Sequence, residues 1–202
     1  MGLKKFYMNY EFRRKSVHFF MGTSFAFIIT IDYFYRYAKL FILGMFIISI
    51  IASVICKYLK PKLVLAMLQL FDKPKDFERL PGKGAIYYLA GMLVSLLLFE
   101  RDVVSASVII LAVGDPTAHF FGRYFGRTRL IINEKKLLEG TLAGTLFATV
   151  AALFFVPFHL AFFGSALGMI AEAIELEYFN LDDNFSIPFV AGTVMSLIKA
   201  AL

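Results

Sequence analysis

The chain has few charged residues for its length. Only 18% of its 202 residues are charged, whereas 59% are hydrophobic. An average soluble domain has roughly 25% charged and about 45–50% apolar residues, and a soluble domain of this size has too little interior to bury so much apolar surface. The composition therefore excludes a soluble enzyme fold, a disordered chain and a collagen-like fibre. It predicts an integral membrane protein of the all-α class.

Cysteine is nearly absent and tryptophan is absent. Cys56 is the one cysteine, so the chain can form no internal disulfide and no four-cysteine metal site. We interpret Cys56, which lies inside an apolar run, as a small buried apolar residue. The aromatic residues that remain, 24 Phe and 10 Tyr, can supply the aromatic belts of a membrane protein.

Apolar runs predict about seven transmembrane helices, because crossing a bilayer takes about 20 mostly apolar residues. The predicted segments are 17–35, 39–57, 84–99, 103–121, 140–156, 158–174 and 187–202. The stretch Lys62–Phe71 is too short to cross and is predicted to be an interfacial helix in a long cytoplasmic loop. We expect one polytopic domain, in which residues 1–83 hold two spans and the basic loop and residues 84–202 form a five-span catalytic part.

Acidic residues are outnumbered, 15 to 21, and the basic residues are unevenly placed. Seventeen of the 21 Lys and Arg residues lie in the stretches 4–15, 57–83 and 123–136, which share one side of a seven-span chain. The positive-inside rule then predicts a cytoplasmic N-terminus and an outside C-terminus. The net charge of +6 is attributed to loops facing anionic lipid and not to nucleic-acid binding. No cleavage site follows the first apolar run, so a retained anchor is expected. The expected location is a prokaryotic cell membrane.

One carboxylate interrupts an apolar helix. Asp115, in Gly114-Asp115-Pro116, follows a stretch without charge, and an ionisable group at membrane depth is a candidate functional residue. It is either a metal-binding or catalytic carboxylate, or an aspartate that caps a short helix together with Thr117. Five cations follow within 25 residues, which suits a Mg²⁺–polyphosphate ligand, although a solvated cytoplasmic loop is also basic. The candidates in this stretch are Gly122, Arg123, Gly126, Arg127, Lys135, Lys136, Glu139, Gly140 and Thr141.

Three further groups lie on the same predicted side. Acidic oxygens, which suit Mg²⁺, occur at Glu172, Glu175 and Glu177 and then at Asp182, Asp183 and Asn184. We rank the last three higher, although a solvated loop with Asp182 capping the last helix is the alternative. Lys15 and His18 share a helix face at the membrane boundary. Gly82, Lys83 and Gly84 precede a helix and form a weak anion-binding signal.

Together these strings resemble the CTP-dependent lipid kinases, namely dolichol kinase, phytol kinase and the CTP-using diacylglycerol kinase. That family belongs with the phosphatidate cytidylyltransferases in a wider membrane superfamily. The matching pieces, which run in the family's order over nearly the whole chain, are RRKSVH (13–18), ERLPGKGA (78–85), GDPTAHFFGRYFGR (114–127), KKLLEGTLAG (135–144) and DDNFSIP (182–188). The first and last pieces favour the kinase branch, and the terminal signature of the cytidylyltransferases is missing.

The resemblance implies transfer of the terminal phosphate of CTP to the hydroxyl of a long-chain isoprenoid alcohol in the bilayer, at the cytoplasmic face. The implied catalytic residues are Asp115, Asp183, His18 and Glu139. The implied nucleotide-binding residues are Lys15, Gly82, Lys83, Gly84, Gly122, Arg123, Gly126, Arg127, Lys135, Lys136, Gly140 and Thr141. The implied Mg²⁺ ligands are Asp115, Asp182, Asp183 and Asn184.

Other functions stay open at this point. A cytidylyltransferase that makes a CDP-lipid, a CTP-dependent diacylglycerol kinase, and a transporter or scaffold without nucleotide chemistry are the alternatives. Small residues within Gly140–Gly144 and Gly164–Gly168 can serve internal packing or a homodimer seam.

Overall fold

The computed structural model describes residues 2–68, 80–174 and 182–202, with side chains from Glu11 onward. This part of the chain is helical apart from its connections and one isolated antiparallel bridge between Arg129 and Leu137. The helices are α1 (Gly2–Ile28), α2 (Asp32–Leu59), α3 (Lys62–Leu68), α5 (Lys83–Leu98), α6 (Arg101–Ile109), α7 (Asp115–Phe125), α8 (Leu138–Ala152), α9 (Phe158–Ile174) and α10 (Asp183–Ala201). A π-helical segment, Ile110–Gly114, joins α6 to α7. The predicted all-α class is confirmed.

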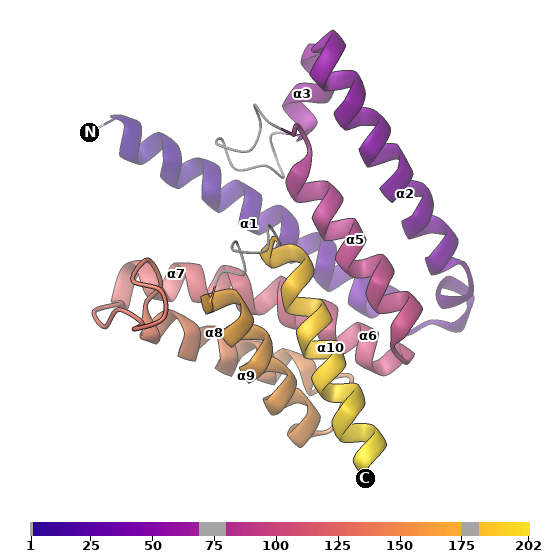
Figure 1. Cartoon of the computed structure of the whole chain (residues 1–202), viewed down its shortest axis with the longest axis vertical. Helices are drawn as coiled ribbons and strands as arrows, with labels where there is room; N and C mark the ends of the chain where they lie inside the picture. Colours follow the sequence, from indigo (N-terminus) through magenta and orange to yellow (C-terminus); the bar gives the residue numbers. More distant parts are fainter. Residues whose placement is uncertain (1, 69–79, 175–181) are drawn as a thin grey trace.

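The helices alternate in direction across the bundle, so the short turns between α1 and α2, between α5 and α6 and between α8 and α9 lie at one end, and the loop 126–137 lies at the other (Figure 1). Three helical runs, α2, the continuous run Arg101–Phe125 and α10, are long and apolar enough to cross a membrane. The apolar helices α5, α8 and α9 are shorter. The protein is therefore a membrane protein, and the number of seven spans stays a prediction.

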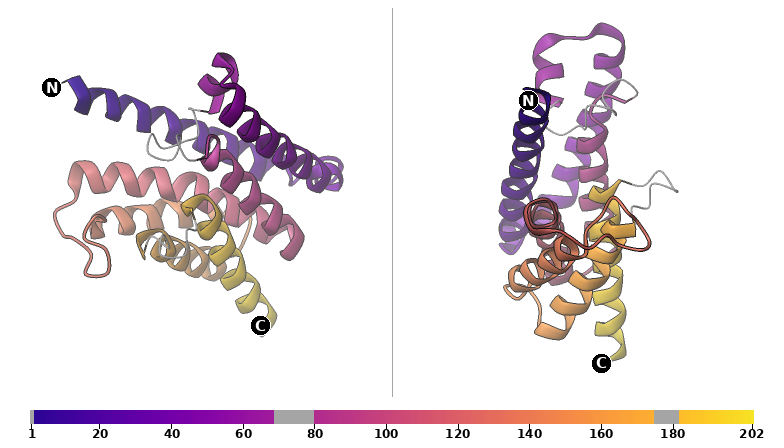
Figure 2. Two further views of the ribbon diagram at one scale, coloured as in Figure 1. Left: turned by 45° about the horizontal axis from the view of Figure 1, so that its top comes forward. Right: turned by 90° about the vertical axis from the view of Figure 1, so that its left-hand side faces the viewer.

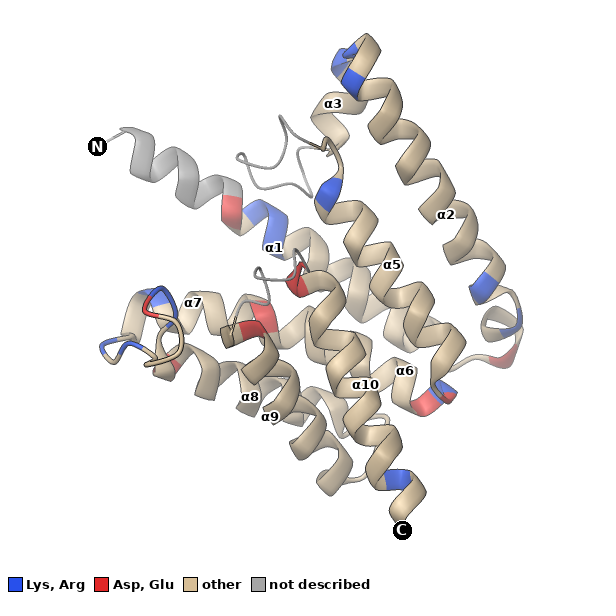
Figure 3. Cartoon of the chain, in the orientation of Figure 1, with Lys and Arg blue, Asp and Glu red and all other residues tan. Residues whose placement is uncertain are grey.

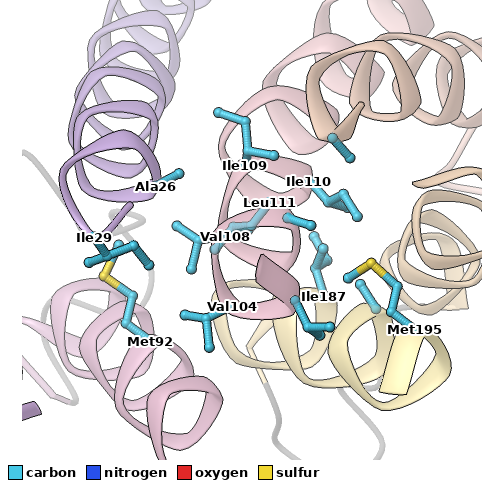
Figure 4. Packing of buried hydrophobic residues seen from close by; sticks show 14 of the residues in the cluster. Ala26, Ile29, Met92, Val104, Val108, Ile109, Ile110, Leu111, Ile187 and Met195 are labelled. Carbon is cyan, nitrogen blue, oxygen red and sulfur yellow. The ribbon is translucent and has the colours of Figure 1, made fainter. Parts of the chain in front are cut away.

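The run Arg101–Phe125 forms the centre of the bundle. Its residues Val104, Val108 and Ile110 are fully buried and pack against side chains of α1, α5 and α10 (Figure 4). A helix that is covered on all sides is apolar all round, which is why this run looks like a membrane span in the sequence. In contrast, α2 lies at the edge of the molecule (Figure 2), where α5 and α3 are its neighbours.

The prediction of one helix over 17–35 is wrong at both ends. The helix α1 extends from Gly2 to Ile28, and the chain turns before α2 starts at Asp32. Arg101 fixes this turn, since its Nε donates to the carbonyl oxygen of Ile29 at 2.8 Å and its guanidinium pairs with Asp32. The turn contains neither glycine nor proline, so the local sequence carries no signal for it.

The other predicted segments agree more closely with the helices. The segment 158–174 coincides with α9, and 84–99 is displaced by one residue from α5. The last helix starts earlier than predicted, because the Asp182 side chain caps it by accepting a hydrogen bond from the amide of Asn184 at 3.2 Å. Of the predicted interfacial helix, residues 62–68 are helical, and residues 69–71 lie outside the described residues.

The small residues proposed for a dimer seam pack inside the chain. A Cβ added to Gly164 would meet the Met195 side chain at 2.8 Å, and one added to Gly168 would meet Ala191 at 3.3 Å, both on α10. Internal helix packing therefore accounts for these glycines, and the homodimer stays a prediction.

Candidate functional site

A cavity of about 490 Å³ opens at the end of the bundle that carries the loop 126–137. Its walls come from α1, α7, α8, α9, the start of α10 and the loop 126–137. Eight of the sequence-predicted site residues line it: Lys15, Asp115, Gly122, Arg123, Lys135, Lys136, Thr141 and Asp183. The structure thus brings together residues from both predicted parts of the chain, 1–83 and 84–202.

A buried ion pair lies in the cavity wall. The Lys15 ammonium of α1 pairs with Oδ2 of Asp115 at the start of α7, and the two side chains are 4% and 2% exposed. Oδ1 of Asp115 accepts no hydrogen bond from the described residues. A buried carboxylate oxygen without a partner is costly. Asp115 therefore has coordination capacity left for a ligand that enters the cavity.

A second ion pair joins the loop 126–137 to α9. The Lys136 ammonium pairs with the carboxylate of Glu172, whose side chain is 4% exposed. Burial alone lowers the pKa of Lys136, but the carboxylates of Glu172 and Asp183 outweigh this effect and raise the pKa above its ordinary value. The lysine is therefore a cation at neutral pH.

The mouth of the cavity carries a third pair and one buried arginine. His119 Nε2 lies 2.8 Å from Glu11 Oε2, and this hydrogen bond lowers the pKa of Glu11 to about 2. Arg14 is 3% exposed, and its Nε has no hydrogen-bond partner among the described residues. A buried cation without a carboxylate partner is costly, so Arg14 suits an anionic ligand.

The loop 126–137 is shaped by contacts at its base. The carboxylate of Glu139 accepts the amide of Thr128 at 3.0 and 3.2 Å, and the amide of Leu138 donates to the Thr128 carbonyl oxygen at 2.9 Å. Because the Glu139 side chain is used in this way, it closes the loop without lining the cavity.

Two predicted nucleotide-binding glycines meet at a helix crossing. The Cα of Gly140 on α8 lies 3.5 Å from the position of a Cβ built on Gly122 of α7. A Cβ on Gly140 would lie 2.5 Å from the carbonyl oxygen of Ala118. The missing side chains therefore let α7 and α8 approach closely.

Ten of the predicted site residues do not line this cavity: His18, Gly82, Lys83, Gly84, Gly126, Arg127, Glu139, Gly140, Asp182 and Asn184. His18 lies 2% exposed and stacks on Tyr88 with ring centroids 4.8 Å apart. Asn184 is 1% exposed, and its side-chain nitrogen and oxygen have no hydrogen-bond partner in the described part of the chain. The roles assigned to these ten stay predictions. Glu175 and Glu177 lie outside the described residues.

Four ionisable residues of the cavity were not among the site residues predicted from the sequence: Glu11, Arg14, His119 and Glu172. Glu11 precedes Lys15 by one helical turn, a spacing that places both on one face. That signal was missed because the first helix was predicted to start at residue 17. Glu172 was named with the acidic oxygens that suit Mg²⁺ but ranked below Asp182, Asp183 and Asn184, since nothing in the sequence indicates that it pairs with Lys136, 36 residues away.

A magnesium ion fits this cavity only together with other ligands. Among the residues that the structure describes, no three His, Cys, Asp or Glu side chains are grouped for metal binding. Magnesium commonly binds through one or two carboxylates and completes its octahedral shell with phosphate and water oxygens. Asp115, with its unpartnered Oδ1, and Asp183 on the cavity wall fit such a site.

Tyr88 supports α1 beside this cavity. Its hydroxyl donates to the carbonyl oxygen of His18 at 3.1 Å. We expect Tyr88→Phe, which keeps the ring and removes the donor, to lower the free energy of unfolding by about 1 kcal/mol. A thermal unfolding comparison in detergent checks this value. A variant as stable as the parent would show that the hydrogen bond contributes nothing net.

No protein-family model and no solved structure matches the chain. An uncharacterised protein of Methanocaldococcus jannaschii is 29% identical over 92% of this chain and 93% of its own length. The CTP-dependent diacylglycerol kinase 1 of Schizosaccharomyces pombe is 30% identical, over 61% of this chain and 64% of its own. The chloroplast phytol kinase 1 of Arabidopsis thaliana is 28% identical, over 52% of this chain and 40% of its own.

The chain is a relative of the CTP-dependent lipid kinases. The resemblance inferred from the sequence motifs is thereby confirmed. The chain spans about 40% to about two thirds of the length of these two named kinases.

Proposed function

We propose that this relative of the CTP-dependent lipid kinases transfers the terminal phosphate of CTP to the hydroxyl of a long-chain isoprenoid alcohol. One observation supports it most directly: the cavity holds cations and carboxylates from four helices and one loop, several of them buried in ion pairs. Phosphoryl transfer needs positioning and charge neutralisation more than covalent chemistry. A cavity of this composition supplies both.

The cations would bind the nucleotide. Arg14, Arg123 and Lys135 line the cavity and make no ion pair within the described residues. Planar guanidinium groups bind phosphate oxygens in a bidentate manner, and lysine adds a point charge. These three residues, with Lys15 and Lys136, would hold the triphosphate in line with the acceptor hydroxyl.

The carboxylates would hold Mg²⁺ and the acceptor proton. Asp115 and Asp183 would bind the ion, which neutralises phosphate charge when it is present. Asp182 and Asn184 lie next to Asp183 at the start of α10. Either Asp115 or Asp183 would accept the proton of the alcohol.

The orientation is part of the proposal. Lys and Arg residues of α1, of the end of α2, of the start of α5 and of the loop after α7 gather toward the end of the bundle where the cavity opens (Figure 3). By the positive-inside rule, that end faces the cytoplasm. In a seven-span chain with an outside C-terminus, CTP and the hydroxyl of the alcohol would meet at the cytoplasmic membrane surface, where the cavity opens. The similarity to an archaeal protein over nearly its whole length supports a prokaryotic cell membrane.

A glyceride acceptor is the second candidate. The S. pombe relative is named a CTP-dependent diacylglycerol kinase, whereas the A. thaliana relative is named for phytol, an isoprenoid alcohol. The exposed apolar side chains of the described helices suit an isoprenoid chain and a glyceride chain equally. A transfer assay with both kinds of acceptor distinguishes them.

A transfer assay in liposomes tests the proposal. The protein is given γ-labelled CTP, Mg²⁺ and, separately, polyprenol, geranylgeraniol, phytol or diacylglycerol. We expect label in an isoprenoid phosphate, with transfer abolished by a magnesium chelator and competed by unlabelled CTP. Label in phosphatidate would identify the glyceride kinase instead. In a parallel reaction with a lipid phosphate in place of the alcohol, labelled pyrophosphate released from CTP together with a CDP-lipid would identify a cytidylyltransferase. No labelled lipid with any of the alcohol acceptors would contradict the kinase.

A further inference from the structure

Glu172 has a place in the cavity that its predicted role, an acidic oxygen suited to Mg²⁺, does not explain. It lies near the end of α9, lines the cavity and is almost completely buried. Its carboxylate is paired with the Lys136 ammonium. A carboxylate in such a position needs a cation or a proton, because a buried charge without a partner is strongly destabilising. The pair therefore ties Lys136 to the wall of the cavity.

The backbone next to this pair holds the same loop. The side-chain amide of Asn133 donates to the carbonyl oxygen of Ala173 at 3.1 Å, and the amide of Lys136 donates to the carbonyl oxygen of Asn133 at 3.0 Å. A turn of the loop is thus docked on the last turn of α9. Two neighbouring residues thus hold the loop: the backbone carbonyl of Ala173 binds Asn133, and the side chain of Glu172 binds Lys136.

We propose that Glu172 is a positioning residue that holds the Lys136 ammonium in place for a phosphate group of the nucleotide. The inference rests on the proposed function and adds a determinant of nucleotide affinity to it. A lysine side chain has four rotatable bonds and loses much freedom when it is fixed. Fixing it before the nucleotide arrives reduces the entropic cost of binding. Glu172 thus acts on binding, whereas Asp115 and Asp183 act at the reacting phosphate.

Three variants test the inference on the full chain in detergent or liposomes. We expect Glu172→Ala and Lys136→Ala each to raise the KM for CTP about tenfold, with kcat changed less than about threefold. This pattern is expected when a mutation removes an interaction that binds the ground state and the transition state equally. The double variant should match Lys136→Ala, because a residue that acts through another is not additive with it. Its thermal stability should exceed that of Lys136→Ala, which leaves the Glu172 carboxylate buried without its cation.

The conservative variant separates positioning from chemistry. Glu172→Gln keeps an oxygen that accepts a hydrogen bond from Lys136, so we expect KM within about threefold of the parent and an unchanged kcat. Glu134→Gln is the matched control, since Glu134 is exposed on the same loop and does not line the cavity. A fall in kcat of about 100-fold or more for Glu172→Gln would place Glu172 at the reacting atoms instead and would overturn the inference.

Direct binding keeps this inference distinguishable from the proposed function. Equilibrium dialysis with labelled CTP measures affinity without any acceptor. A parent protein that binds CTP but phosphorylates no lipid refutes the proposed kinase and leaves the role of Glu172 measurable. Equal CTP affinity of the parent and of Glu172→Ala refutes the positioning role, even if the parent is an active kinase.

Discussion

The variant Asp115→Asn is expected to fold and insert but to lose about 100-fold or more of the transfer rate. Asparagine has the shape of aspartate and can still accept a hydrogen bond from Lys15. It lacks the charge that the proposed roles require, whether in binding Mg²⁺ or in accepting the alcohol proton. The rate is measured with labelled CTP at saturating concentration, so that a change in nucleotide affinity does not contribute.

Stability must be measured beside the rate, because the ion pair of Asp115 with Lys15 is buried. Removing one partner of a buried pair costs about 3–5 kcal/mol when the other charge is left uncompensated, and the asparagine oxygen should reduce this cost. Asp102→Asn is the matched control: it makes the same change in the same helical run but at the opposite end, where Asp102 pairs with Lys199 at 2.7 Å. The control should retain activity. Turnover of Asp115→Asn at the parental rate would remove Asp115 from the mechanism.

The fold was predictable to the extent that apolar length decides it. Helix α9 coincides with its predicted segment, because apolar residues fill it and polar residues follow it. The first turn was missed, because it is held by Arg101, which lies about 70 residues away in sequence. Local pattern carries no information about such a distant partner. The π-helical segment before Asp115 is a similar case, since it lies within 103–121, which the apolar pattern predicts only as one continuous segment.

The candidate site was predictable where the chemistry is concentrated in one stretch. Asp115, Arg123 and Lys136 all lie within the basic stretch of 25 residues that begins at Asp115, and all three line the cavity. Sequence reasoning named Glu172 only as an acidic oxygen suited to Mg²⁺, because its pairing with Lys136 depends on how a distant loop packs against α9. It also assigned glycines to the ligand when some face a neighbouring helix. Gly140 shows this most clearly. From the sequence alone, a glycine there is equally suited to the close approach of a nucleotide and to the close approach of a neighbouring helix.

Gly140→Ala is expected to destabilise the protein by about 1–3 kcal/mol, the usual cost of overpacking. The added Cβ would lie 2.5 Å from the Ala118 carbonyl oxygen and 2.9 Å from the Gly122 Cα. Both are backbone atoms of α7 that cannot rotate away, so α7 and α8 must separate. Because α7 begins with Asp115 and α8 carries Thr141 at the cavity wall, the separation should also lower the transfer rate. Thermal unfolding in detergent measures the first effect and the labelled-CTP assay the second.

Gly44→Ala is the matched control for this change. It is also a helical glycine, but a Cβ added there meets no atom within 4 Å, and alanine favours a helix over glycine by about 1 kcal/mol. The control should therefore be as stable as the parent or more stable, with unchanged activity. If Gly140→Ala instead keeps the parental melting temperature and only raises the KM for CTP, the helix crossing is not its role. The glycine would then serve close approach of the nucleotide, as the sequence motif predicts.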